Sequence, residues 1–122
     1  MTSVILARRA IRDLRSIKAY SVKNWGPEVA REYMGHFESA LTRLREHPGL
    51  LQSKKTIHDH LLFYRVQQYY LVCTRIEATV YVLSVRHGSE DLQTRIAELE
   101  PQLEDEARIL HHRLKKQTAS SR

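Results

Sequence analysis

The spacing of apolar residues changes along the chain, and each change marks a new structural element. The run SVILA at 3–7 is short, β-branched and apolar, which predicts a first strand. From Arg8 the apolar residues recur every three or four positions, which is the period of a helix. Only Gly26-Pro27 breaks this period, and Pro27 suits the first position of a second helix. We therefore expect a helical hairpin over Arg8–His47.

Three strand-like runs follow, each rich in Val, Ile, Leu, Tyr and Phe: His58–Val66, Tyr69–Ile76 and Val80–His87. The intervening segments, QQ and EAT, are short enough to be hairpin turns. These runs predict an antiparallel meander. One face of it would pack on the helical hairpin, and the other would meet solvent, a partner or the last helix.

The C-terminal part has an apolar stripe at helical spacing from Leu92 to Leu114. Pro101 should kink this helix or start a new one, and we favour a new helix beginning there. The tail KKQTASSR is expected to be disordered. The predicted fold class is α+β: an N-terminal strand and αα-hairpin packed on an antiparallel β-meander, followed by a C-terminal amphipathic helix.

Composition and charge narrow the class of protein. A chain of 122 residues fits one domain, no apolar run is long enough to span a membrane, and the single Cys73 suits a reduced, cytoplasmic protein. The net charge is +6, with 12 Lys/Arg against 6 Asp/Glu in residues 1–65 and 8 against 8 in residues 66–122. A basic first half attracts either nucleic acid or an acidic protein segment.

The candidates for metal binding and nucleophilic catalysis are weak. His58 and His60 share one face of a strand, but a third ligand would have to come from His87 or Glu77, and zinc sites need three or four ligands. We therefore expect neither a metal nor another cofactor.

The thiol and the hydroxyl that lie in strands are also poor nucleophiles. Cys73 has apolar neighbours, as inert thiols do, and Ser84 is expected to be a packed strand residue.

The first strand of the meander carries large apolar groups on both faces. The face that does not pack on the hairpin would therefore expose apolar surface unless a partner or the last helix covers it, which indicates a docking surface rather than a pocket. Strand alternation places His60, Leu62, Tyr64 and Val66 on one face, and Leu61, Phe63 and Arg65 on the other.

Several linked motifs resemble the ParE branch of the RelE/ParE superfamily of bacterial type II toxins, over residues 3 to about 97. The resemblance implies a helical hairpin on an antiparallel sheet, a cognate ParD-like antitoxin that forms an oligomer with the toxin, and growth inhibition when the toxin is unopposed. It divides the chain into a toxin domain, 1–97, and a C-terminal helical extension, 98–122. The motifs are Tyr20…Trp25-Gly26, Ala30…Tyr33, His47-Pro48-Gly49, His60…Phe63-Tyr64-Arg65 and Arg86-His87.

The superfamily has two activities, and the resemblance favours the one without catalysis. RelE-like members cleave mRNA on the ribosome with a strand arginine and further basic residues, but the arginine position corresponds here to Leu61 and the last basic position falls near Gly88. A displaced nuclease set would comprise His60, Arg65, Arg86 and His87.

ParE-like members instead bind DNA gyrase and trap it on cleaved DNA. The apolar Leu61 and Phe63 beside Arg65 suit such protein binding, and direct contact with nucleic acid stays open. We therefore expect a non-enzymatic toxin of the bacterial cytoplasm. The alternatives are a RelE-like mRNA endonuclease and a non-toxic binding module. The expected partner-binding residues are Leu61, Phe63, Arg65, Arg86 and His87.

The extension beyond the family core has three interpretations: a helix that docks on its own sheet, an oligomerisation helix, or a tail without a role. A helix that covers the sheet would occupy the place that an antitoxin takes elsewhere, and the chain would then be a weak or inactive toxin.

Overall fold

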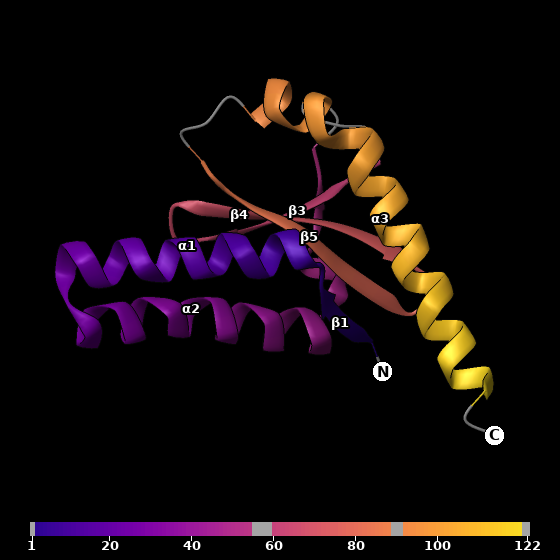
Figure 1. Ribbon diagram of the computed structural model, residues 1–122, viewed down its shortest axis with the longest axis horizontal. Helices are drawn as coiled ribbons and strands as arrows, with labels where there is room; N and C mark the ends of the chain where they lie inside the picture. The colour runs from indigo at the N-terminus through magenta and orange to yellow at the C-terminus, as the bar shows by residue number, and fades with distance from the viewer. Residues whose placement is uncertain (1, 55–59, 89–91, 121–122) are drawn as a thin grey trace.

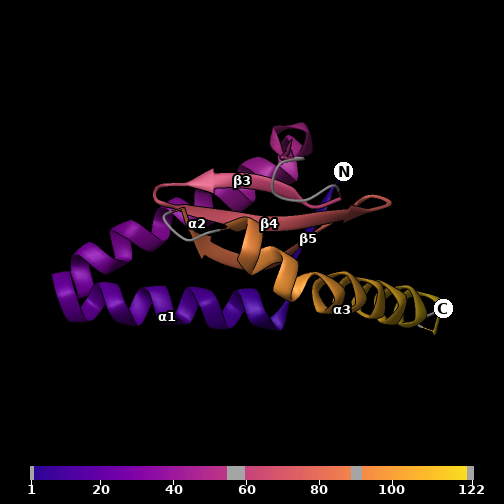
Figure 2. The same cartoon turned by 90° about the horizontal axis from the view of Figure 1, so that it is seen from above.

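A five-stranded sheet lies between a helical hairpin on one face and a single long helix on the other (Figures 1 and 2). The structure, a computed structural model, describes residues 2–54, 60–88 and 92–120. The strand order is β1-β5-β4-β3-β2, with β1 parallel to β5 and all other neighbours antiparallel. The strands are β1 (Ser3–Leu6), β2 (Gln52–Ser53), β3 (Leu62–Val66), β4 (Tyr69–Ile76) and β5 (Thr79–His87). The helices are α1 (Arg8–Trp25), α2 (Pro27–Glu46), the 3₁₀ turn η1 (Pro48–Leu50) and α3 (Leu92–Ser120).

The helical hairpin forms as the sequence predicts, with its turn at Gly26. This residue has φ +90°, a backbone conformation that residues with a side chain rarely adopt, and its N–H donates to the carbonyl of Val22 at 2.9 Å. Pro27 then starts α2, where its missing N–H costs nothing. No helix in the described part of the chain is long and apolar enough to cross a membrane.

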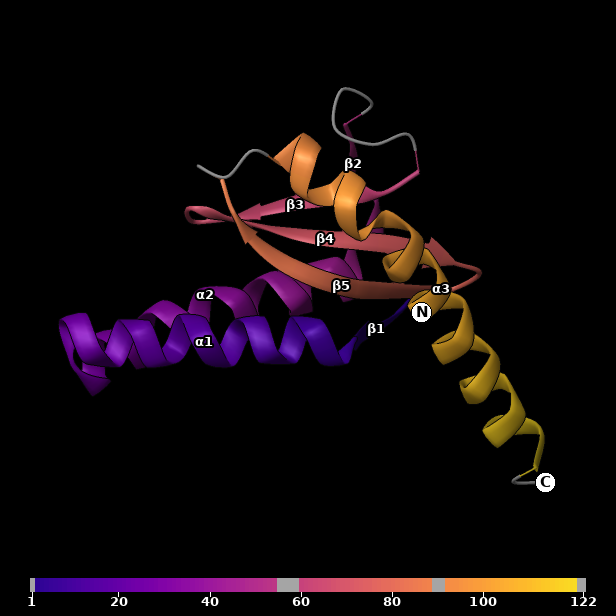
Figure 3. The ribbon, with the colours of Figure 1, turned by 45° about the horizontal axis from the view of Figure 1, so that its top comes forward.

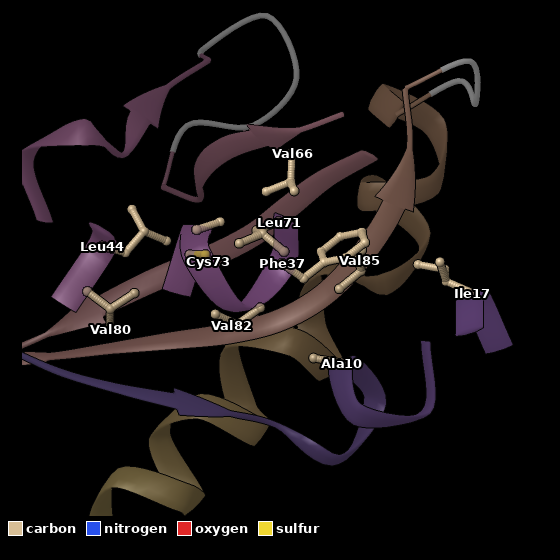
Figure 4. Close-up of a cluster of buried hydrophobic side chains, with 11 residues drawn as sticks. Ala10, Ile17, Phe37, Leu44, Val66, Leu71, Cys73, Val80, Val82 and Val85 are labelled. Atoms are coloured by element: carbon tan, nitrogen blue, oxygen red, sulfur yellow. The ribbon is translucent and has the colours of Figure 1, made fainter. Parts of the chain in front are cut away.

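The main core lies between the hairpin and the sheet (Figure 4). Ala10 on α1 and Ala40 on α2 are fully buried, and their small side chains let the two helices approach the sheet closely. Phe37 and Leu44 of α2 add bulk to the same cluster. The sheet contributes Val66, Leu71, Cys73, Val80, Val82 and Val85.

One carboxylate of α1 completes the edge of β5. The register of β1 ends where Leu6 pairs with Val82, so the next part of that edge has no strand neighbour there. The Oδ2 atom of Asp13 accepts hydrogen bonds from the backbone N–H of Val85 and from the hydroxyl of Ser84, both at 2.9 Å. Asp13 thereby satisfies buried polar groups that would otherwise be unpaired.

Helix α3 covers the opposite face of the sheet. Ile96 and Ala107 are buried in a second apolar cluster, against which Leu110 and Leu114 pack. The sheet side of that cluster includes Leu61, Phe63, Val72, Tyr81 and Leu83.

Polar contacts near the far end of α3 fix it to the sheet and to α1. The hydroxyl of Tyr81 and Nδ1 of His111 share a hydrogen bond of 2.6 Å. Glu77, in the turn between β4 and β5, pairs with Lys115 at 2.7 Å, and the hydrogen bond from Lys115 lowers the pKa of this carboxyl. Arg9 of α1 pairs with Glu106 at 3.1 Å.

Two expectations for the C-terminal region are wrong. A new helix does not begin at Pro101, because α3 is continuous from Leu92, and the helix changes direction after its first turns (Figures 1 and 3). A proline within a helix commonly bends it without ending it. Burial of Ile96 in one part of α3 and of Ala107 in the other keeps both parts on the sheet. The tail is not disordered from its first residue, because the helix continues to Ser120.

The predicted strands agree with the structure within a few residues. The second and third runs correspond to β4 and β5, and β5 begins one residue earlier than expected. The first run begins late, because β3 starts at Leu62; His58, where we expected the strand to start, lies outside the described residues.

Replacing Leu44 by Ala should destabilise the fold by about 2–5 kcal/mol, because Leu44 has no exposed surface and the truncation leaves a cavity in the main core. Leu50→Ala is the matched control: this leucine is 42% exposed and its truncation should cost within about 0.5 kcal/mol. Urea unfolding of both variants measures the difference. Equal losses of stability would contradict the assignment of the core.

Replacing Tyr81 by Phe should loosen α3 without unfolding the sheet, because it removes the hydroxyl that bonds His111 and keeps the ring. A lost hydrogen bond of this kind costs about 0.5–1.5 kcal/mol. Hydrogen exchange should therefore accelerate in the second half of α3 and stay unchanged in β4. Tyr20→Phe, at an exposed ring on α1, is the control. Uniform acceleration over the whole chain would show that α3 does not open separately.

Candidate partner-binding site

Two arginines and a tyrosine line up across three neighbouring strands at one end of the sheet. Arg65 on β3 is opposite Tyr70 on β4, and Tyr70 is opposite Arg86 on β5, so the three side chains share the face that α3 covers elsewhere. We call these residues the basic ladder. The guanidinium of Arg65 lies 5.5 Å from the Tyr70 ring centroid, and Nζ of Lys54 lies 5.6 Å from the same centroid. The ladder therefore combines positive charge with an aromatic surface.

The two arginines of the ladder differ in how they are held. Arg65 is exposed, and its Nε donates to the carbonyl of Gln67 at 2.9 Å. Arg86 is half-buried, and its Nε has no hydrogen-bond partner in the described structure. A buried unpaired N–H is costly, so this N–H lowers the stability of the sheet at its end.

His87 follows Arg86 in sequence but lies on the other face of the sheet. Its ring packs edge to face on Tyr69, with centroids 5.0 Å apart, and Tyr69 in turn contacts Phe37 of α2. His87 also lines a hollow of about 250 Å³ at the tip of the hairpin, together with Trp25 and Tyr33. Strand alternation therefore separates His87 from the basic ladder.

Leu61 and Phe63 do not form an open surface in this conformation. Each is only 1% exposed, and both lie in the second apolar cluster beneath α3. The sequence left open whether a partner or the chain's own last helix covers this face, and in the structure the last helix, α3, covers it.

The displaced nuclease set does not converge. His60 lies just before β3, beside Arg75 and the end of β4, whereas Arg65 lies near the other end of β3. Arg86 and His87 face opposite sides of the sheet. General acid–base catalysis needs its groups within hydrogen-bonding reach of one substrate, and these four residues do not share such a place.

Gly88 leaves little room for a side chain. Its N–H donates to the carbonyl oxygen of Gln68 at 2.7 Å, and a Cβ atom on Gly88 would lie 3.1 Å from that same oxygen. A side chain at this position would therefore fit only if the neighbouring turn gave way by a few tenths of an ångström.

Cys73 and Ser84 are packed strand residues, as the sequence predicts. Both are fully buried; burial raises the pKa of the Cys73 thiol, and the Ser84 hydroxyl is used by Asp13. Among residues 2–54, 60–88 and 92–120, no group of three or more His, Cys, Asp or Glu side chains is arranged to hold a metal ion.

Sequence reasoning missed the central residue of the ladder and the histidine that anchors α3. Tyr70 could have been found by pairing β3 with β4 across the two-residue turn, which places it opposite Arg65. His111 carried no comparable signal, because its partner Tyr81 is 30 residues away in sequence.

The chain is similar to a family of known proteins. The family model described as "ParE toxin of type II toxin-antitoxin system, parDE" matches residues 4–92. The protein "Toxin ParE" of Escherichia coli is 30% identical over 99 residues, which cover 80% of this chain and 96% of that protein.

A solved structure titled "Chromosomal ParDE TA system from P. aeruginosa" has a similar fold, with a TM-score of 0.64 at 16% identity, over 71% of this chain and 96% of the solved chain. The family match ends at the first residue of α3, so most of this helix lies outside it. Since the match covers residues 4–92, which include the hairpin, the basic ladder and all of the sheet except Ser3, the chain belongs to the family of ParE toxins of type II toxin–antitoxin systems.

Proposed function

We propose that the chain inhibits bacterial growth by binding DNA gyrase and trapping it on cleaved DNA, and that a cognate antitoxin neutralises it. The match of residues 4–92 to ParE toxins carries this proposal. The protein would act in the cytoplasm, where gyrase and DNA meet.

The toxin would act by binding alone. The four residues of the nuclease alternative lie at both ends and on both faces of the sheet, which gives a substrate phosphate no place to meet an acid, a base and a cation together. Arginine and aromatic side chains, which make up the basic ladder, are the residue types that contribute most to protein interfaces.

The partner surface we propose has an accessible part and a covered part. Arg65, Arg86 and His87 lie at the end of the sheet where the β3–β4 turn meets the end of β5. Leu61 and Phe63 become available only when α3 leaves the sheet. A partner that uses both parts must therefore supply enough binding free energy to replace the contacts of α3 with the sheet. Helix α3 thus competes with the partner for Leu61 and Phe63.

A supercoiling assay with purified gyrase tests the target. The wild-type chain should reduce supercoiling and accumulate cleaved DNA. Arg65→Ala combined with Arg86→Ala should require at least about tenfold more protein for the same effect, because each arginine would lose contacts to the target. Arg75→Ala, an exposed arginine at the opposite end of β4, is the matched control and should act like the wild type.

The absence of cleaved DNA at high excess of the wild-type chain would refute gyrase poisoning. Translating ribosomes supplied with mRNA provide the second arm of the experiment. Cleavage of that mRNA, abolished by replacing Arg86 and His87 with Ala, would establish the endonuclease alternative instead.

A further inference from the structure

Helices α1 and α3 enclose a groove of about 250 Å³ where the start of α1 meets the second half of α3. Ala7, Ile109 and Leu110 form its apolar lining (the floor), and Arg8, Arg12 and Arg113 form its basic lining (the rim). We call it the α1–α3 groove. Because the family match stops at residue 92, one wall of this groove is a feature of this chain beyond the matched core.

The charge of the groove is unbalanced. Its acidic lining residue, Glu106, is already bound by Arg9 at 3.1 Å. Arg8, Arg12 and Arg113 are exposed, and within the described residues no ion pair joins any of them to a carboxylate. Three guanidinium groups around one groove attract an anionic ligand, which carboxylates would satisfy with paired hydrogen bonds.

The floor decides which anion fits best. Ile109 is 53% exposed, one of the most exposed large apolar side chains of the described chain, and Leu110 beside it is half-buried. A nucleic-acid backbone would gain nothing from this apolar floor. A peptide that alternates acidic and apolar side chains satisfies the floor and the rim together.

We propose that the α1–α3 groove binds an acidic, apolar segment of the cognate antitoxin and thereby holds α3 on the sheet. The inference rests on the proposed function in that it takes the partner to be the antitoxin. Since the groove needs both helices, its occupant binds only the docked position of α3 and stabilises it by mass action. Leu61 and Phe63 then stay buried, so the antitoxin neutralises the toxin by keeping its apolar surface covered.

A designed peptide tests the groove without knowledge of the antitoxin. The probe is a fluorescein-labelled 16-residue peptide of leucine and glutamate at helical spacing, titrated with the full chain by fluorescence anisotropy. Matched peptides carry Gln in place of Glu, or Ser in place of Leu, and each should bind at least about tenfold more weakly. Binding of all three peptides with equal affinity would overturn the proposal, as would no binding of the first.

Variants locate the binding. Arg12→Ala with Arg113→Ala should weaken the leucine–glutamate peptide at least about tenfold, and Ile109→Ser should weaken it about three- to tenfold. Arg31→Ala, an exposed arginine of α2 outside the groove, is the matched control and should change affinity less than about twofold. Circular dichroism confirms that each variant is folded. If the groove variants bind the peptide with unchanged affinity, the assignment of the site is wrong. It is also wrong if duplex DNA binds the chain as tightly as the peptide does and Ile109→Ser leaves the affinity for DNA unchanged.

Hydrogen exchange distinguishes clamping from displacement. Saturating peptide should slow hydrogen exchange in the second half of α3, by a factor determined by the affinity and concentration of the peptide. Faster exchange there would mean that the peptide displaces α3, and the inference would be wrong. The gyrase assay is scored separately. If the wild-type chain poisons gyrase but the groove variants bind the peptide as tightly as the wild type, only the groove inference is refuted. Absence of poisoning refutes the gyrase proposal and leaves the groove to be decided by the titrations.

Discussion

Strand β5, which lies between β1 and β4 in the sheet, is apolar on both of its faces, and each face has to be removed from water. Val80 and Val82 of β5 point toward the hairpin, while Tyr81 and Leu83 point toward α3, and all four are fully buried. Burial of apolar area is the dominant stabilising contribution in a domain of this size, so a strand with two apolar faces needs two covers. The hairpin is one cover and α3 is the other.

The two covers are not equivalent. The hairpin packs a broad surface of two helices on the sheet, whereas α3 offers one stripe of a single helix and a few polar contacts at its far end. An element with fewer buried contacts opens at lower free energy than the rest of the fold. The sheet face beneath α3 is therefore the part of the core that costs the least free energy to expose.

The sequence predicted the elements well because their signals are local. The period of apolar residues revealed the hairpin, and Gly26-Pro27 placed its turn; β-branched and aromatic runs revealed the strands. The sequence could not decide whether a partner or the C-terminal helix covers Leu61 and Phe63, because this depends on contacts between residues more than 30 positions apart. For the same reason the position of His60 far from Arg65, and the structural use of Asp13 and His111, became visible only in three dimensions.

The position of Asp13 also fixes how α1 is oriented about its own axis. Its carboxylate bonds two groups of β5 at 2.9 Å, and a rotation of α1 by one residue, about 100°, would point it away from the sheet. Arg12 is the neighbouring residue, so the bond that completes the edge of β5 also sets the direction in which Arg12 leaves the helix. A substitution at Asp13 that left the protein folded would thus redirect a surface arginine about 100° further around the helix, so a change at the edge of the sheet would alter the basic lining of the α1–α3 groove.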